Sequence, residues 1–176
     1  MPGSGQARGA WGWHPLDSRW AQRIVDSAGI TPGELVLDVG AGLGALTAPL
    51  VRAGAQVVAV ELHPGRADRL RRRFADAPVT VVRADAADLR LPRRPFRVVS
   101  SPPYGISTAL LKRLLAPGSR LVSADLVLQR AVVNRWTARP TRYYDLSIGI
   151  RLPRKAFTPP PHVDSAVLLI RRTTRK

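Results

Sequence analysis

The chain has 176 residues, which is enough for one compact domain with a buried core. It carries 28 Lys and Arg residues against 12 Asp and Glu residues, a formal net charge of +16, so we expect a polyanionic partner. The absence of cysteine excludes disulfides and thiolate catalysis, three scattered histidines predict no metal site, and the lack of a bilayer-long apolar run or a signal-peptide core disfavours a membrane partner.

The N-terminal stretch is rich in Gly and Ser, and we expect residues 1–12 to form a flexible basic arm. One folded domain is predicted over residues 13–172, followed by a basic tail over residues 173–176. Within the domain, apolar residues at helical spacing predict a first helix over residues 17–28.

A buried strand and a glycine turn come next in the chain. The apolar run 35–39 contains Asp38, and Gly40, Gly42 and a third glycine follow before a helix that is expected to extend through about Leu50. Glycines let a ligand approach the backbone, and helix amides would face it. The spacing differs from the dinucleotide fingerprint, because the third glycine comes too early and an Asp precedes the first. The turn is therefore a candidate ligand loop of another class.

Two further strands end in acidic residues. The strand at 57–60 ends in Glu61, which is placed for two ribose hydroxyls. The strand at 79–82 leads into Asp85, which can accept a hydrogen bond from an adenine amino group. For either acid alone, a helix N-cap is an equally good explanation.

A fourth strand at 97–100 leads into Ser101, Pro102, Pro103 and Tyr104. The serine offers a hydrogen-bond acceptor, and the prolines fix φ and remove two backbone donors, so that the carbonyls point one way. The tyrosine offers a flat face, and the set suits the exocyclic amino group of a nucleobase. A Pro-Pro turn after a strand is usually only a turn. Four successive strand ends with such groups favour a binding site, because ligands of open α/β sheets bind at the carboxyl ends of the strands.

Three further helices are predicted at residues 64–74, 107–115 and 129–137, and three further strands at residues 121–127, 143–152 and 165–170. The first of these helices is amphipathic and carries Arg66, Arg69, Arg71, Arg72 and Arg73. Such a run is typical of a solvated face, with contact to a nucleic acid as the alternative.

These motifs resemble the S-adenosylmethionine-dependent rRNA adenine-N6 methyltransferases. Within that superfamily they are similar to the Erm group, which methylates 23S rRNA and confers macrolide–lincosamide–streptogramin B resistance. The resemblance is greatest to the short members that lack most of the C-terminal helical domain. The matching segments are residues 38–47, 60–61, 84–86, 102–107 and 157–165. The last segment is a proline run between an aromatic residue and the final strand, which leaves the loop little freedom.

The resemblance implies an α/β, Rossmann-like class I methyltransferase fold, with a central, mostly parallel seven-stranded sheet and helices on both faces. It implies that the last two strands form an antiparallel pair at one edge of the sheet. It also implies that residues 13–172 form a catalytic domain, that S-adenosyl-L-methionine is the cofactor, and that 23S ribosomal RNA is the partner. We further expect a cytoplasmic monomer.

The same resemblance implies the site residues. The catalytic set is Ser101, Pro102, Tyr104 and Phe157, with Phe157 near the target base. The cofactor set is His14, Leu16, Asp38, Gly40, Gly42, Glu61, Asp85, Ala86 and Ser101. Two positions depart from the family. Asn is usual where Ser101 stands, and a Gln-Asn-Phe-Leu run, which contacts the methionine end of the cofactor, is usual around residues 14–16.

Three functions remain open at this stage. The first is the Erm-type enzyme, and the second is the same chemistry on small-subunit rRNA or DNA, since serine at position 101 also occurs in cytosine-N4 enzymes. The third is a non-catalytic RNA-binding protein. The segment 157–165 favours the rRNA enzymes, and the presence of both Glu61 and Asp85 argues against a protein without use for a cofactor.

Overall fold

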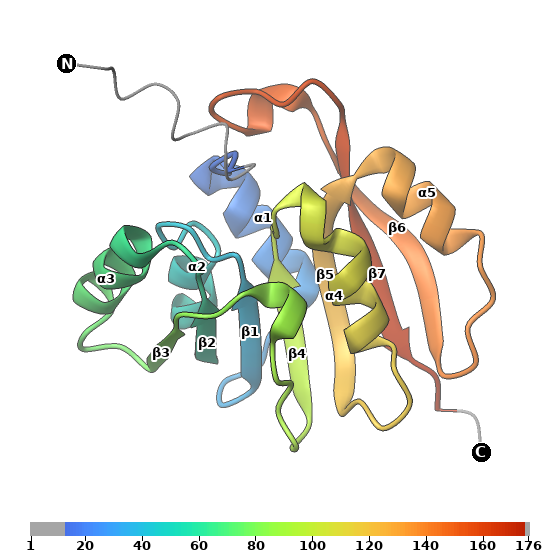
Figure 1. Cartoon of the computed structure of the whole chain (residues 1–176), viewed down its shortest axis with the longest axis horizontal. Coiled ribbons are helices and arrows are strands. Elements are labelled where there is room, and N and C mark those ends of the chain that lie inside the picture. The colour runs from blue at the N-terminus through green and yellow to red at the C-terminus, as the bar shows by residue number, and fades with distance from the viewer. Residues whose placement is uncertain (1–12, 175–176) are drawn as a thin grey trace.

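The computed structural model describes residues 13–174, so the predicted arm at residues 1–12 and the last two residues of the tail lie outside it. The strands are β1 Leu35–Val39, β2 Gln56–Val60, β3 Val79–Val82, β4 Phe96–Ser100, β5 Leu121–Gln129, β6 Tyr144–Leu152 and β7 Ser165–Arg172. They form one sheet in the order β3-β2-β1-β4-β5-β7-β6 (Figure 1). β1 to β5 are parallel, whereas β7 runs antiparallel to both β5 and β6. The predicted mixed sheet with an antiparallel edge is confirmed.

Helices cover both faces of the sheet, as predicted. The α-helices are α1 Ser18–Ala28, α2 Thr47–Arg52, α3 Pro64–Arg73, α4 Ser107–Leu114 and α5 Arg130–Thr137, and the single-turn 3₁₀ helices are η1 Ala86–Asp88, η2 Tyr104–Ile106 and η3 Arg154–Ala156. α4 and α5 pack on one face, and α1, α2 and α3 pack on the other. No helix within residues 13–174 is long and apolar enough to cross a membrane.

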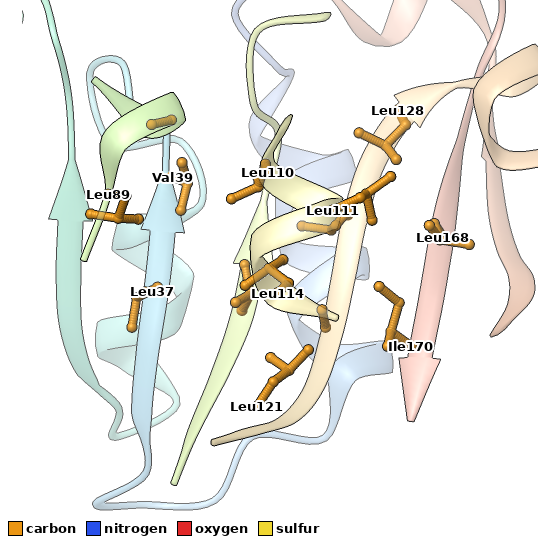
Figure 2. Packing of buried hydrophobic residues seen from close by; sticks show 14 of the residues in the cluster. Leu37, Val39, Leu89, Leu110, Leu111, Leu114, Leu121, Leu128, Leu168 and Ile170 are labelled. Carbon is orange, nitrogen blue, oxygen red and sulfur yellow. The ribbon is translucent and has the colours of Figure 1, made fainter. Parts of the chain in front are cut away.

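The core is built by apolar side chains that alternate between the two faces of the central strands. On one face, Leu37 and Val39 of β1 share a cluster with Leu110, Leu111 and Leu114 of α4 (Figure 2). Burial of such side chains stabilises a fold by about 25 cal/mol per Å² of apolar surface. Because β1 is buried along its whole length, its end is a rigid base for the loop that follows.

The strand order reverses between β1 and β4, and the two strands separate there. Their main-chain register covers Val36 and Leu37 of β1 only. Beyond it, the buried Ser100 hydroxyl accepts a hydrogen bond from the Val39 amide at 2.7 Å and donates to the Leu37 carbonyl at 3.3 Å. This side chain satisfies the groups left unpaired where the sheet opens. In open α/β sheets, such a switch point is where ligands bind.

The helix predicted after the glycine turn is present, and it begins three residues beyond Gly44. Turns occupy residue 40 and residues 42–46, and α2 begins at Thr47. Gly40, Gly42 and Gly44 have φ values of 75°, 61° and 96°, which a right-handed helix does not allow. The helix therefore forms only after the third glycine, and the loop itself, rather than a helix terminus, faces the switch point.

Candidate functional site

A pocket of about 250 Å³ opens at the carboxyl ends of β1, β2 and β4. It lies at the switch point, where parallel register brings Val39 level with Val60 and Val60 level with Val82. The sequence-predicted residues that line it are His14, Leu16, Asp38, Gly40, Glu61, Asp85, Ala86, Ser101, Pro102, Tyr104 and Phe157. Gly42 is the one predicted residue outside this lining. Residues from four strand ends, the N-terminal segment and the 157–165 loop thus share one cavity.

The glycine loop and the Ser-Pro-Pro-Tyr turn pack directly on each other. Gly40 has a φ of 75°, and a Cβ atom there would lie 2.7 Å from Cδ of Pro103 and 3.3 Å from Cα of Pro102. Real Cβ atoms do not approach ring or backbone carbons that closely. Only glycine allows β1 to end against the turn, so this contact sets the distance between the two halves of the pocket.

Glu61 holds the glycine loop in place. Its carboxylate is buried and accepts hydrogen bonds from the amides of Gly42 at 2.8 Å and His63 at 3.0 Å. The guanidinium of Arg66 donates to the same carboxylate through Nε at 3.2 Å, and its second nitrogen lies 3.1 Å from it. The acid predicted for ribose binding is therefore already ordered by main-chain and side-chain donors.

Trp13 and Arg66 extend this arrangement towards the N-terminal segment. The Arg66 guanidinium lies over the indole ring of Trp13 in a cation–π contact, with Cζ of Arg66 4.6 Å from the ring centroid. A Cβ atom on Gly42 would meet the indole nitrogen at 2.8 Å, so Trp13 covers the glycine loop from outside. Both residues line the pocket. The Arg66 side chain is only 14% exposed, which corrects its predicted place on a solvated face.

Asp38 joins β1 to α2. It is buried, and its carboxylate accepts a hydrogen bond from the Thr47 hydroxyl at 2.7 Å, at the first residue of the helix. Burial raises the pKa of Asp38 to about 7; the Glu61 charge adds to this rise and the Thr47 hydrogen bond opposes it. These contacts fix the path of the glycine loop.

The Ser-Pro-Pro-Tyr turn presents different groups. Pro102 is buried, whereas Ser101 and Tyr104 are half-buried and reach the pocket. The Ser101 hydroxyl makes no hydrogen bond to another described residue. The Tyr104 hydroxyl lies 2.9 Å from Oγ of Ser165, and burial raises the Tyr104 pKa although that hydrogen bond opposes the rise. The turn thus offers an acceptor and an aromatic ring to the cavity.

Asp85 has a structural contact as well as a place on the pocket rim. Its carboxylate accepts a hydrogen bond from the Ala87 amide at 2.9 Å and caps the η1 turn. The side chain is exposed, and the next residue, Ala86, is buried beneath the cavity. The N-cap explanation and the ligand explanation therefore apply to the same residue.

The N-terminal segment forms one wall of the pocket by pairing with the 157–165 loop. Leu16 and Phe157 form an antiparallel bridge, and the Thr158 amide donates to the Pro15 carbonyl at 3.0 Å. Phe157 is 2% exposed and packs in the same apolar cluster as Leu16. His14 is half-buried beside this pairing, and its Nδ1 donates a hydrogen bond to the Pro159 carbonyl at 2.9 Å. These two chain segments, which are far apart in sequence, together form this wall of the pocket.

Sequence reasoning did not assign Trp13, Arg66 and Arg73 to the site, and all three line the pocket. The signal for Arg66 was its place in the first turn after Glu61, but it was hidden among four other arginines. Arg73 donates to the Leu43 carbonyl at 2.7 Å and so braces the glycine loop from α3. No local pattern predicted that contact.

Comparison with solved structures identifies the fold. The crystal structure of the 23S rRNA methyltransferase ErmE matches with a TM-score of 0.83 and 30% identity, covering 91% of this chain and 70% of ErmE. A dimethyladenosine transferase from Plasmodium falciparum matches with a TM-score of 0.81 and 22% identity, covering 91% of this chain and 64% of that chain. The predicted class I methyltransferase fold is confirmed.

Sequence relatives point the same way. The mycinamicin-resistance protein MyrB of Micromonospora griseorubida is 39% identical over 167 residues, which cover 89% of this chain and 53% of MyrB. Ribosomal RNA small subunit methyltransferase A of Cupriavidus taiwanensis is 36% identical over 171 residues, covering 87% of this chain and 61% of that protein. This chain therefore spans less than two thirds of the length of these relatives.

A sequence profile described as "Ribosomal RNA adenine dimethylase" matches residues 15–176, which is nearly the whole chain. The match includes the strand ends, the Ser-Pro-Pro-Tyr turn and the 157–165 loop that build the pocket. The chain belongs to the ribosomal RNA adenine dimethylase family.

Proposed function

We propose that this chain transfers a methyl group from S-adenosyl-L-methionine to N6 of an adenine in 23S rRNA, and so protects the ribosome from macrolide-type antibiotics. The observation that carries the proposal is the single pocket in which the glycine loop and Glu61 meet the Ser101–Tyr104 turn. A methyl donor and its acceptor must meet in one cavity for direct transfer. The similarity to MyrB and ErmE supports the choice of 23S rRNA.

The residues present fit the cofactor. Gly40 lines the cavity where the glycine loop packs on the Ser101–Tyr104 turn, and the buried Glu61 carboxylate and the rim carboxylate of Asp85 flank the same cavity. Glu61 would bind the ribose hydroxyls, Asp85 the adenine amino group, and the main chain of residues 40–42 the methionine carboxylate. When bound, the cofactor supplies an electrophilic methyl group on a positively charged sulfur.

The turn after β4 would hold the target base. Adenine N6 is a poor nucleophile, because its lone pair is delocalised into the ring. The Ser101 hydroxyl and the Pro102 carbonyl would accept hydrogen bonds from the two N–H groups of the adenine amino group. These hydrogen bonds would direct the nitrogen lone pair towards the methyl group. Holding two reactants in this way can supply roughly 7–11 kcal/mol of a barrier. Stacking on Tyr104 would add about 1–3 kcal/mol of binding.

The +16 charge supports RNA as the partner, because each phosphate contact with a Lys or Arg releases counterions. All residues assigned to the two half-sites come from one chain, which supports a monomer. Ribosomal RNA as substrate supports a cytoplasmic location.

Transfer of labelled methyl groups to purified rRNAs tests the proposal. Unmodified 23S and 16S rRNA are offered separately, and the modified base is mapped. We expect label in an adenine of 23S rRNA and its loss in Tyr104→Ala. Label in 16S rRNA alone would favour the small-subunit function, which the similarity to the C. taiwanensis enzyme supports. No label in either RNA, with calorimetric cofactor binding intact, would favour a non-catalytic RNA-binding protein.

A further inference from the structure

We propose that His14 forms the second aromatic wall of the target-adenine site, opposite Tyr104. The inference rests on the proposed methyl transfer to adenine and assigns to this chain a base contact that its sequence motifs did not indicate. It concerns the N-terminal segment, where the chain departs from its family.

The two rings already face each other. The imidazole of His14 and the phenol ring of Tyr104 have centroids 6.0 Å apart and planes inclined by 25°, and both rings line the pocket. Each face of a base needs roughly 3.5–4.0 Å to a stacked ring, so a sandwiched base needs rings about 7 Å apart. A small outward shift of His14 would admit a planar base between the two rings.

Both rings are held at their polar edges, which leaves their faces available. The Pro159 carbonyl can only accept a hydrogen bond, so the His14 Nδ1 at 2.9 Å carries the proton and donates it. The Tyr104 hydroxyl lies 2.9 Å from Oγ of Ser165. Pro159 belongs to the proline-rich stretch between η3 and β7, which has little backbone freedom, and Ser165 is the first residue of β7. The stretch and the start of the strand that follows it therefore set the spacing of the two rings.

Main-chain pairing fixes the segment that carries His14. The Thr158 amide donates to the Pro15 carbonyl at 3.0 Å, and the Asp17 amide donates to the Ala156 carbonyl at 2.8 Å. This pairing places His14 at the open end of the paired segments, half-buried and next to the cavity. The ring is therefore ordered before any ligand arrives, which lowers the entropy cost of stacking.

Phe157, the aromatic residue that the family resemblance places near the base, has a different environment. Its side chain is 2% exposed and packs among apolar residues of the second core cluster, including Leu16 and Ala156. A ring in that environment can back the site, but it offers little free face. Of His14 and Phe157, His14 is the one with an accessible face.

Two substitutions separate the ring of His14 from its hydrogen bond. His14→Phe keeps an aromatic face and loses the Nδ1 donor, whereas His14→Asn keeps a short donor and loses the ring. We expect His14→Asn and His14→Ala to raise the KM for 23S rRNA about 10-fold, the size of a lost stacking contact, and His14→Phe to stay within about threefold of the parent. The dissociation constant for S-adenosylmethionine should change by less than about twofold in all three variants.

A matched control and a binding measurement complete the test. Tyr143→Asn removes an exposed aromatic ring outside the pocket and should behave as the parent, and thermal denaturation confirms that each variant is folded. In parallel, a short single-stranded RNA with 2-aminopurine as its only purine is titrated without cofactor turnover. We expect stacking to quench its fluorescence in the parent and in His14→Phe but not in His14→Asn.

The opposite ranking, with His14→Asn active and His14→Phe impaired, would overturn the inference and leave His14 as an anchor for the loop. A weakened cofactor affinity with an unchanged KM for RNA would overturn it in favour of a cofactor contact. Absence of quenching in the parent would also overturn it. Since the quenching requires no methyl transfer, it tests His14 even if the parent methylates neither rRNA, so the two failures are distinguishable.

Discussion

The two walls of the pocket are built in different ways. On the cofactor wall, polar groups bind one another: the Glu61 carboxylate accepts hydrogen bonds from Gly42, His63 and Arg66. On the base wall, the Ser101 hydroxyl bonds to no other described residue, and the Tyr104 side chain has a hydrogen bond with Oγ of Ser165 and a ring contact with His14. The first wall is a fixed frame, whereas the second offers an unused acceptor and ring faces. Substitutions in the frame should therefore alter the geometry of both half-sites, whereas substitutions in the base wall should alter the methylation rate or the binding of RNA.

The largest effect is expected at the contact between the two walls. In Gly40→Ala, the new methyl group would lie 2.7 Å from Cδ of Pro103, a ring atom that cannot rotate away. The Ser101–Tyr104 turn must then shift, and a misplacement of about 1 Å can cost about 100-fold in rate. We expect at least this loss of methyl transfer to 23S rRNA under single-turnover conditions.

Gly33→Ala is the matched control for this prediction. Gly33 has a φ of 85°, similar to that of Gly40, but a Cβ atom there would meet nothing within 4 Å. Both variants should lose roughly 1–2 kcal/mol of stability from the strained backbone, measured by urea denaturation. Only Gly40→Ala should lose activity. Equal activity in the two variants would show that the contact with Pro103 does not set the site geometry.

The next effect concerns cofactor affinity. Glu61→Gln removes the charge that we assign to the ribose, and we expect a loss of about 1.5–3 kcal/mol in S-adenosylmethionine binding by calorimetry. Arg66→Gln breaks the same buried ion pair but leaves the carboxylate and its bond from Gly42 in place. If Glu61 touches the ribose, Glu61→Gln should weaken binding more than Arg66→Gln. Equal losses would reduce Glu61 to a support for the loop.

The strand-end positions of the site could be predicted from sequence because they depend on local patterns. A buried parallel strand needs a continuous apolar run, and the residue after it must lie at one edge of the sheet. That reasoning placed Glu61, Asp85 and Ser101 at the same edge, and all three line one cavity. The antiparallel edge of the sheet followed from the family resemblance instead.

What could not be predicted depends on tertiary contacts or on backbone conformation. The start of α2 at Thr47 follows from three glycines with positive φ, which the sequence permits but does not require. The contact between His14 and Tyr104 joins segments that meet only through the 157–165 loop, so no local spacing signals it. The sequence placed Arg66 among the arginines of a solvated helix face, whereas in the fold its side chain forms an ion pair with Glu61.

A smaller, purely kinetic effect is expected on the base wall. Ser101→Ala removes one acceptor for the adenine amino group and should lower the single-turnover methylation rate about 10-fold or more, a typical size for one positioned hydrogen bond. Ser101→Asn, with a longer acceptor, should keep or raise the rate. Stability and cofactor affinity should hardly change. A rate in Ser101→Ala equal to that of the parent would leave the Pro102 carbonyl as the only acceptor.

Ser100→Ala is the natural counterpart, because it changes the neighbouring residue in the same way. Its hydroxyl is fully buried and bonds to Val39 and Leu37 at the opening of the sheet. Loss of that bridge leaves buried main-chain groups unsatisfied, at a cost of about 1–3 kcal/mol in the free energy of unfolding. Ser101→Ala should thus lower the methylation rate, and Ser100→Ala should lower the free energy of unfolding, although the two serines are adjacent in the chain.

An effect of a different kind is a pH dependence of stability at Asp38, whose carboxylate accepts a hydrogen bond from the first residue of α2. Burial raises the pKa of this carboxyl from 3.8 to about 7 in the folded chain. Between these two values the folded state binds more protons than the unfolded state, so the free energy of unfolding falls as pH rises through that window and levels off above it.

Asp38→Asn should remove this fall in stability. Between pH 4 and pH 7, the melting temperature of the variant should therefore rise relative to that of the parent, by about 2–4 °C for each kcal/mol that the parent loses. Thr47→Val removes the hydrogen bond that opposes the rise in pKa, and should extend the fall to higher pH. Melting curves of parent and Asp38→Asn that stay parallel across this range would mean that Asp38 is ionised throughout, and that the frame carries two buried negative charges at the mouth of the glycine loop.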